Sequence, residues 1–172
     1  MKFKLTIIII AILFIFSYCD KKEPPKVYNT KDDYLPCQTF KLYGNGQFEE
    51  CTLSEDAIIQ GLEIKAGSEV AFNEKGRFSR CTLSLDTTIK GIPLKAKSRI
   101  MFHDDLKPWM IEVSEDTVIQ NIPCKKKTWV SFYESGKLLS ATLSKEITAK
   151  DRKYEKDTAI CLDEKENFIE CH

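Results

Sequence analysis

A four-residue segment that recurs every thirty residues is the feature that most constrains how this chain can fold. The first copy is Cys51-Thr52-Leu53-Ser54, and later copies begin at Cys81, Ile111 and Ala141 with no insertion between them. Self-similarity at a fixed period of this kind is typical of arrays in which each repeat contacts its neighbours. We therefore expect residues 37–172 to form one β-repeat domain of about four and a half repeats.

Each repeat contains two short segments in which apolar and polar residues alternate, as they do in β-strands. The first copies are Leu62-x-Ile64 and Val70-x-Phe72. The position just before the first segment holds only residue types that tolerate a left-handed backbone, which predicts a tight turn with positive φ. These turn residues are Gly61, Gly91, Asn121 and Asp151. The pattern predicts an all-β fold.

A second turn follows the second strand of each repeat. Asn73-Glu74-Lys75-Gly76 has the spacing of a type I turn closed by a glycine in a G1 bulge. Such a turn would set apolar residues opposite one another, and cross-strand pairs of this kind stabilise a sheet. The predicted pairs are Leu42 with Phe48, Phe72 with Phe78, Phe132 with Leu138, Leu162 with Phe168 and, as an odd fifth, Phe102 with Pro108.

Because both turns have the features of hairpins, we expect an extended meander sheet of antiparallel hairpins. A β-solenoid is the alternative. In a solenoid, the equivalent residues Cys51 and Cys81 would stack about 4.8 Å apart and a disulfide could join them. In a meander, other strands separate them and that bond is out of reach.

The hairpin at 103–110 departs from the repeat, since it has no turn glycine and carries Pro108 where the others have an apolar partner. Proline cannot donate to a ladder, so we expect an edge strand or a bulged loop here. Variations between repeats often lie on a binding face. His103, Trp109 and Met110 are therefore candidate binding residues, and the alternative is a loop that varies freely under weak constraint.

Six cysteines follow Cys19, and their even number permits three disulfides. Cys37 and Cys51 flank the first hairpin, and Cys161 and Cys171 flank the last, so these four are candidates for two disulfides that hold the ends of the array. Cys81 and Cys124 would then remain as an unlikely pair or as free thiols. All six could also be small buried residues.

The first nineteen residues have the pattern of an export signal. Lys2 and Lys4 precede an apolar run from Leu5 to Tyr18, which is shorter than the roughly 20 residues of a spanning helix. The segment Phe16-Ser17-Tyr18-Cys19 resembles the lipobox of bacterial lipoproteins, although Tyr18 stands where that motif usually has Gly or Ala. The alternatives are ordinary secretory cleavage and an uncleaved anchor.

The resemblance implies that residues 1–18 are removed and that Cys19 is acylated, which would hold the chain on a membrane of the bacterial cell envelope. The outer membrane is favoured, with the domain periplasmic or surface-exposed. Residues 19–36 are charged and contain proline, so we expect a flexible linker there.

The hairpin segments at 72–78 and 132–138, Phe-Asn-Glu-Lys-Gly-Arg-Phe and Phe-Tyr-Glu-Ser-Gly-Lys-Leu, resemble the core of MORN-type repeats and of their YwqK-like bacterial relatives. The likeness covers about seven residues per repeat, and the period is longer here. It implies an array of hairpins that serves as a binding or structural surface, and it brings no catalytic residues with it.

Charge and motif content argue against several functions. The chain has 26 basic and 26 acidic residues, and removal of Lys2 and Lys4 with residues 1–18 leaves 24 against 26, so no nucleic-acid partner is expected. The one basic run, Lys125-Lys126-Lys127, falls at an expected turn. There are only two histidines, His103 and His172, and no cofactor or metal motif.

An acid recurs once in each repeat, at Asp56, Asp86, Asp116 and Glu146. Repetition in every copy indicates a turn or cap, because a catalytic pair would not need to be multiplied. We expect a membrane-tethered binding module without catalysis. The alternatives are a structural or self-assembling envelope component and an inhibitor of an external enzyme.

Overall fold

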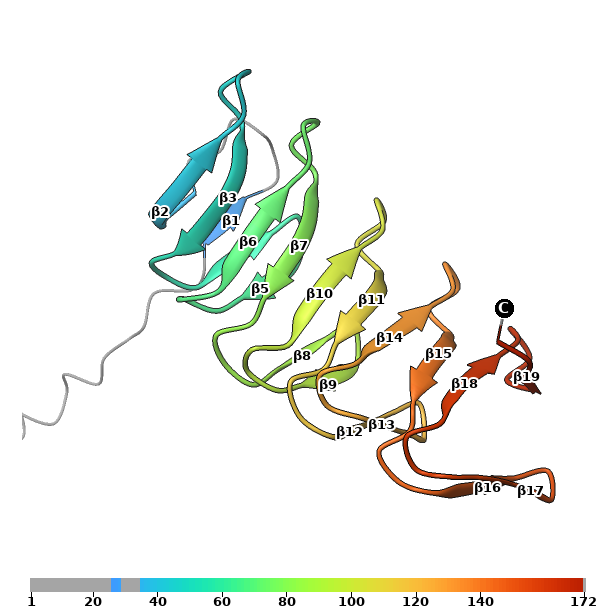
Figure 1. Ribbon diagram of the computed structural model, residues 1–172. Helices are drawn as coiled ribbons and strands as arrows, with labels where there is room; N and C mark the ends of the chain where they lie inside the picture. The colour runs from blue at the N-terminus through green and yellow to red at the C-terminus, as the bar shows by residue number, and fades with distance from the viewer. Residues whose placement is uncertain (1–25, 29–34, 172) are drawn as a thin grey trace, which may run out of the picture.

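The computed structural model describes residues 26–28 and 35–171, and its main element is a ten-stranded antiparallel sheet (Figure 1). Neighbouring strands in this sheet follow one another in sequence, apart from the small hairpins inserted between them. In order across the sheet the strands are β2 (Cys37–Leu42), β3 (Phe48–Leu53), β6 (Glu69–Phe72), β7 (Phe78–Thr82), β10 (Arg99–Phe102), β11 (Pro108–Glu112), β14 (Trp129–Phe132), β15 (Leu138–Thr142), β18 (Ala159–Leu162) and β19 (Phe168–Ile169).

A row of four small hairpins forms a second layer. Figure 1 shows them along one side of the array, each leaving the main sheet and returning to it. They are β4 (Ala57–Ile59) with β5 (Leu62–Ile64), β8 (Thr87–Ile89) with β9 (Ile92–Leu94), β12 (Thr117–Ile119) with β13 (Ile122–Cys124), and β16 (Ile147–Ala149) with β17 (Arg152–Tyr154). The predicted all-β hairpin array is confirmed. Within the described residues the sheet closes into neither a barrel nor a solenoid.

The tight turns of the small hairpins have the backbone that the sequence predicts. Positive φ angles occur at all four predicted positions, from 64° at Asp151 to 89° at Gly61. The preceding residue is left-handed as well, for example Gln60 at 48°. Two successive left-handed residues are the signature of a type I′ turn, whose twist suits a two-residue hairpin.

The predicted strand pairing is also confirmed. All five pairs are opposite one another: Leu42 with Phe48, Phe72 with Phe78, Phe102 with Pro108, Phe132 with Leu138 and Leu162 with Phe168. In the first four hairpins the register shifts by one residue next to the pair, as a bulge requires.

The hairpin at 103–110 keeps the backbone of its neighbours. Leu106 takes the place of the turn glycine with a φ of 62°, and the N–H of His103 donates to the carbonyl of Lys107 at 2.9 Å. Pro108 lies in β11, between β10 and β14 in the middle of the sheet. The expectation of an edge strand is therefore wrong, while that of a bulge is right. The hairpin pairs with a strand on each side, and this pairing imposes the common backbone despite Leu106 and Pro108.

The core lies between the two layers. Along each main strand alternate residues point toward the small hairpins, and those of the central rows are almost completely buried: Cys51, Val70, Cys81, Ile100, Ile111, Val130, Ala141 and Ile160. They meet apolar residues of the second layer such as Ile59, Ile89 and Ile119, each no more than 2% exposed. Burial of this continuous apolar seam is the main force that holds the layers together.

Gln120 ties the tip of one small hairpin to the main sheet. Its Oε1 accepts a hydrogen bond from the N–H of Leu138 at 2.9 Å, and its Nε2 donates to the carbonyl of Gly136 at 2.8 Å. Gln60 makes the equivalent two bonds sixty residues earlier. This arrangement satisfies a backbone donor where the two layers meet.

The repeat between these two has Lys90 at the glutamine position, and Pro108 stands where the other repeats have the N–H donor. Proline has no N–H, so this repeat has no donor for a glutamine to satisfy. The two departures from the repeat therefore match each other.

The ends of the array are held by disulfides between the cysteines that flank the terminal hairpins. Cys37 bonds to Cys51, and Cys161 bonds to Cys171. Cys51 and Cys81 are not joined, which agrees with a meander.

The first end has one additional strand. Strand β1 (Lys26–Tyr28) pairs in parallel with β4, and Tyr28 and Leu35 are buried in the core. Since β1 lies inside the segment 19–36, which we expected to be a flexible linker, the described part of that segment is folded against the array.

Candidate functional site: the open face of the sheet

In the part of the chain that the structure describes, the small hairpins cover one face of the main sheet and no element covers the other. Side chains alternate between the two faces of a strand, so the neighbours of the buried core residues point away from the second layer. This surface, which we call the open face, runs across all ten strands of the sheet. One of its rows consists of Lys41, Glu50, Ala71, Arg80, Met101, Met110, Ser131, Ser140 and Cys161.

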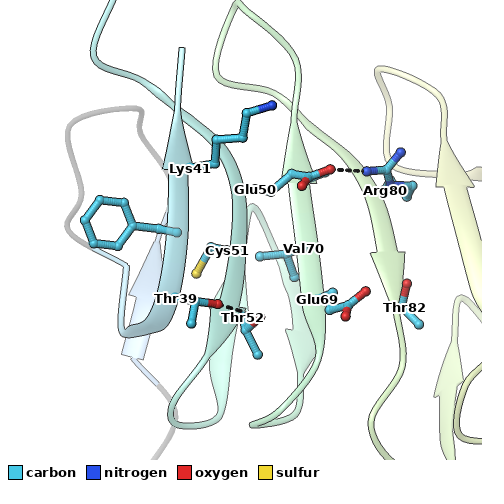
Figure 2. Close-up of a pocket in the computed structure, with 11 residues that line it drawn as sticks. Thr39, Lys41, Glu50, Cys51, Thr52, Glu69, Val70, Arg80 and Thr82 are labelled. Carbon is cyan, nitrogen blue, oxygen red and sulfur yellow. Dashed lines mark hydrogen bonds and ion pairs between the residues drawn. The ribbon is translucent and has the colours of Figure 1, made fainter.

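The N-terminal half of the open face is polar, as Figure 2 shows. Its residues line a shallow hollow of about 320 Å³ on β2, β3, β6 and β7. Arg80 pairs with Glu50 at 2.5 Å, and the hydroxyl of Thr39 donates to that of Thr52 at 3.1 Å. Lys41 pairs with Glu49 at 2.6 Å. These side chains satisfy one another, as on a hydrated surface.

The middle of the open face is different, because it gathers large apolar and aromatic side chains on β10, β11 and β14. We call this group the tryptophan patch, and its members are Arg99, Met101, Trp109, Met110, Glu112 and Trp129. Met101 lies directly opposite Met110, and Glu112 lies between Arg99 and Trp129. Trp109 and Trp129 keep 38% and 36% of their surface exposed. The patch therefore presents two exposed indole rings, with the half-buried Met101 and Met110 on the same surface.

Arg99 orders one side of the patch. Its guanidinium forms an ion pair with Glu112 and lies 5.6 Å from the centre of the Trp129 ring. A cation over an indole face is attracted by the ring quadrupole and restricts both side chains. Trp129 is thus held in position while it remains accessible.

Trp109 lies at the edge of the tryptophan patch, where the bulge of β11 meets the hairpin tips. His103 and Trp109 line an open hollow of about 680 Å³ at the hairpin tips, with their ring centres 6.3 Å apart. Met110 lies on the open face, in the tryptophan patch. The sequence prediction missed Trp129. Its signal was present, because Trp129 directly precedes the inward-pointing Val130 and must face the other way.

His103 has a structural explanation. Tyr43 and Tyr133 occupy the same repeat position, and their hydroxyls donate to the carbonyls of Phe72 and Leu162 in the next hairpin at 3.0 and 2.9 Å. His103 has a shorter side chain in place of the tyrosine. Its buried Nε2 has no hydrogen-bond partner among the described residues. Of the candidate binding residues, Trp109 and Met110 are the two that belong to an exposed surface patch.

The acids that recur in each repeat serve as caps in the first three copies. The carboxylates of Asp56, Asp86 and Asp116 each accept a hydrogen bond from a backbone N–H ten residues later, at 2.8 to 3.0 Å. Lys95 and the Ala96 N–H hold the pKa of Asp86 below its usual value. Glu146 instead pairs with Lys153 at 2.8 Å. The predicted turn or cap role is seen in three copies.

Two cysteines remain as free thiols, Cys81 and Cys124. Burial raises the pKa of Cys81 to about 12 and that of Cys124 to about 11. Such thiols stay protonated at neutral pH and are poor nucleophiles and metal ligands. Both therefore serve as small core residues.

Three further observations bear on function. In residues 26–28 and 35–171, no group of His, Cys, Asp or Glu is arranged to hold a metal ion. No helix in this part of the chain is long and apolar enough to span a bilayer. The predicted lipidation residue, Cys19, lies outside the described residues.

Comparisons with protein-family models, with curated proteins and with solved structures find no match to this chain.

Proposed function

We propose that this chain is a lipid-anchored interaction module of the bacterial cell envelope, which binds a protein partner through the tryptophan patch and has no catalytic activity. The observation that carries the proposal is the exposed patch on a rigid sheet. None of the described elements forms a second layer over the open face, and its middle three strands present Trp109 and Trp129 together with the half-buried Met101 and Met110.

The composition of the patch favours a protein as the ligand. Interface cores are enriched in aromatic residues, Met and Arg. Residues whose truncation costs the most binding energy are commonly Trp and Arg. The patch contains two Trp, two Met and one Arg, on adjacent strands. Sheet strands also hold such side chains in fixed positions, which reduces the entropy lost on binding.

The anchor in this proposal rests on the sequence. Cys19 and the first residue of β1, Lys26, are separated by only six residues, 20–25. A fully extended segment of that length spans roughly 20 Å. An acylated Cys19 would therefore keep the first hairpins close to the membrane surface.

Lipid labelling of the protein in its own cells tests the anchor. We expect the wild-type chain to incorporate a labelled fatty acid and a Cys19→Ala variant to incorporate none. Protease treatment of intact cells then distinguishes a surface-exposed domain from a periplasmic one. Absence of label in the wild-type chain would exclude the anchor.

Site-specific photo-cross-linking in the same cells tests the binding surface. A photoreactive amino acid at Met110 is expected to give a discrete adduct with one other protein, and Trp129→Ala should abolish it. The matched control is Val118 on β12, which is 54% exposed but lies in the layer of small hairpins. Equal cross-linking from both positions, or none from Met110, would contradict a role for the patch.

One observation favours the alternative function, a structural component that assembles through its sheet edges. Phe40 and Leu42 on the edge strand β2 are more exposed than the tryptophans of the patch.

A further inference from the structure

The two edges of the main sheet are built differently. Strand β2, at the N-terminal edge, has six residues, whereas β19, at the other edge, has two. An edge strand exposes unpaired N–H and C=O groups that can pair with another chain, and short edges limit this pairing. The difference in length alone makes β2 the more competent edge.

The Cys161–Cys171 disulfide further closes the C-terminal edge. In the other repeats, the residue equivalent to Cys161 lies opposite the one equivalent to Glu170, as in the pair of Ala71 with Arg80. Cys161 instead lies opposite Ile169, one residue out of that register. Such a slip turns the following side chains to the other face. The end of the chain thus leaves the register in which a further strand would continue the array.

Strand β2 has its own disulfide, Cys37–Cys51, and a register shift between Cys37 and Thr39, but it stays in register with β3 from Thr39 to Lys41. Phe40 lies opposite the core residue Cys51 and so points to the side of the second layer, yet 58% of its surface is exposed. Leu42 points the same way and is 44% exposed. The only charged residue of β2 is Lys41, which pairs with Glu49 on the neighbouring strand. Among the described residues, no strand pairs with the free edge of β2.

We propose that two copies of this chain form a closed dimer by antiparallel pairing of their β2 strands. A strand of the same sequence fits this edge best in the register that has Phe40 on the two-fold axis. The two Phe40 side chains then meet on the core side, and Lys41 of each copy lies opposite Thr39 of the other. A register centred on Lys41 would set two lysines opposite each other, which is unfavourable.

The two-fold axis of this dimer runs perpendicular to the sheet. Both layers of small hairpins therefore lie on the same side, and the exposed ends of the two cores meet across the axis. The tryptophan patches remain uncovered on the opposite face. Since the contact uses the same surface of each copy and the C-terminal edges are blunted, assembly stops at two chains. The inference depends on neither the lipid anchor nor the tryptophan patch.

Light scattering of the full chain in detergent solution, coupled to size-exclusion chromatography, tests the dimer. We expect the protein mass of two chains for the wild type. The Phe40→Lys variant should give one chain, or dissociate at least ten-fold more readily across a concentration series. Because Phe40 is more than half exposed, we expect the substituted monomer to fold, which circular dichroism would verify.

The matched control is Ile169→Lys, which places the same charge on an exposed apolar residue of the opposite edge. This variant should stay dimeric. A wild-type mass of one chain, a dimer that only Ile169→Lys dissociates, or growth into longer polymers would each overturn the proposal. A photoreactive residue at position 40 provides a second measurement that is independent of Phe40→Lys: it should cross-link to residues 39–41 of the other copy, and cross-linking elsewhere would contradict the register.

Discussion

Substitution of Gln120, which connects the two layers, tests how much a single hydrogen bond between the layers contributes to stability. We predict that Gln120→Lys destabilises the chain, because it removes the acceptor for the N–H of Leu138. Leu138 is only 2% exposed, so water cannot readily replace Gln120. A buried donor without a partner costs about 1–3 kcal/mol. For a chain of this size, 1 kcal/mol shifts Tm by about 2–4 °C, so the expected decrease is about 2–12 °C.

Lysine is the appropriate replacement because other repeats already use it at this position. Lys90 and Lys150 have φ angles of 48° and 47°, and Gln120 has 47°. Backbone strain is therefore matched, while the acceptor for the Leu138 N–H and the amide donor to the Gly136 carbonyl are removed. The control is Lys90→Gln in the repeat that carries Pro108 at the donor position, which should change stability by less than about 0.5 kcal/mol.

A double-mutant cycle between Lys90→Gln and Pro108→Leu completes the test. The leucine restores an N–H, which only the glutamine can satisfy, so the pair should be more stable than the sum of the single changes by about 0.5–3 kcal/mol. Chemical denaturation followed by circular dichroism measures each term. A Gln120→Lys variant as stable as the wild type, or a coupling near zero, would refute the reasoning.

His103→Tyr should stabilise the chain by about 0.5–1.5 kcal/mol, since its hydroxyl can donate to the next hairpin as those of Tyr43 and Tyr133 do; a loss in thermal denaturation would contradict this. The thiols of Cys81 and Cys124 should resist alkylation at pH 8 until the chain unfolds. Folding raises the pKa values of both thiols, so their contribution to the free energy of unfolding is complete below the unfolded pKa near 9 and is lost as the pH rises toward 11 to 12. Cys81→Ala should therefore reduce the loss of stability that denaturation measures between pH 8 and 11. Replacement of Cys161 and Cys171 by serine should cost about 2–4 kcal/mol, seen as faster hydrogen exchange in β18 and β19, and unchanged exchange there would show that the disulfide does not hold the edge.

Much of the fold could be predicted from the sequence because its determinants are local. Positions that need positive φ are marked by residue type, as at Gly61 and Asn121. The strand register follows from the turn that connects the two strands, which is why the five cross-strand pairs could be predicted. The separation into two layers was not predictable in this way. Alternation identifies the buried side of a strand, but it does not say which other strands cover that side.

The hairpin at 103–110 shows the reverse limitation. Its sequence indicates an irregular edge, but the neighbouring strands impose the common backbone and Leu106 adopts a φ of 62°. Contacts with other hairpins explain two further features that the sequence alone does not. One is the side chain of His103, whose buried Nε2 has no hydrogen-bond partner among the described residues. The other is the combination of Lys90 with Pro108. The tryptophan patch is also a product of the array, because Arg99 and Trp129 come from different repeats and meet only across β11.

Only six residues separate Cys19 from β1 in the sequence, so in the proposed anchored protein the number of repeats would set how far the binding surface lies from the anchored end. The patch is centred on β11, five strand spacings from β2, which corresponds to about 24 Å along the array. Each repeat adds two strands to the main sheet and so lengthens the array by about 10 Å. Insertion or removal of thirty residues between the first hairpin and β10 would then change the distance along the array between the anchored end and the binding surface in fixed steps. Repeat number would set which partners are within reach, without any change to the residues that contact them.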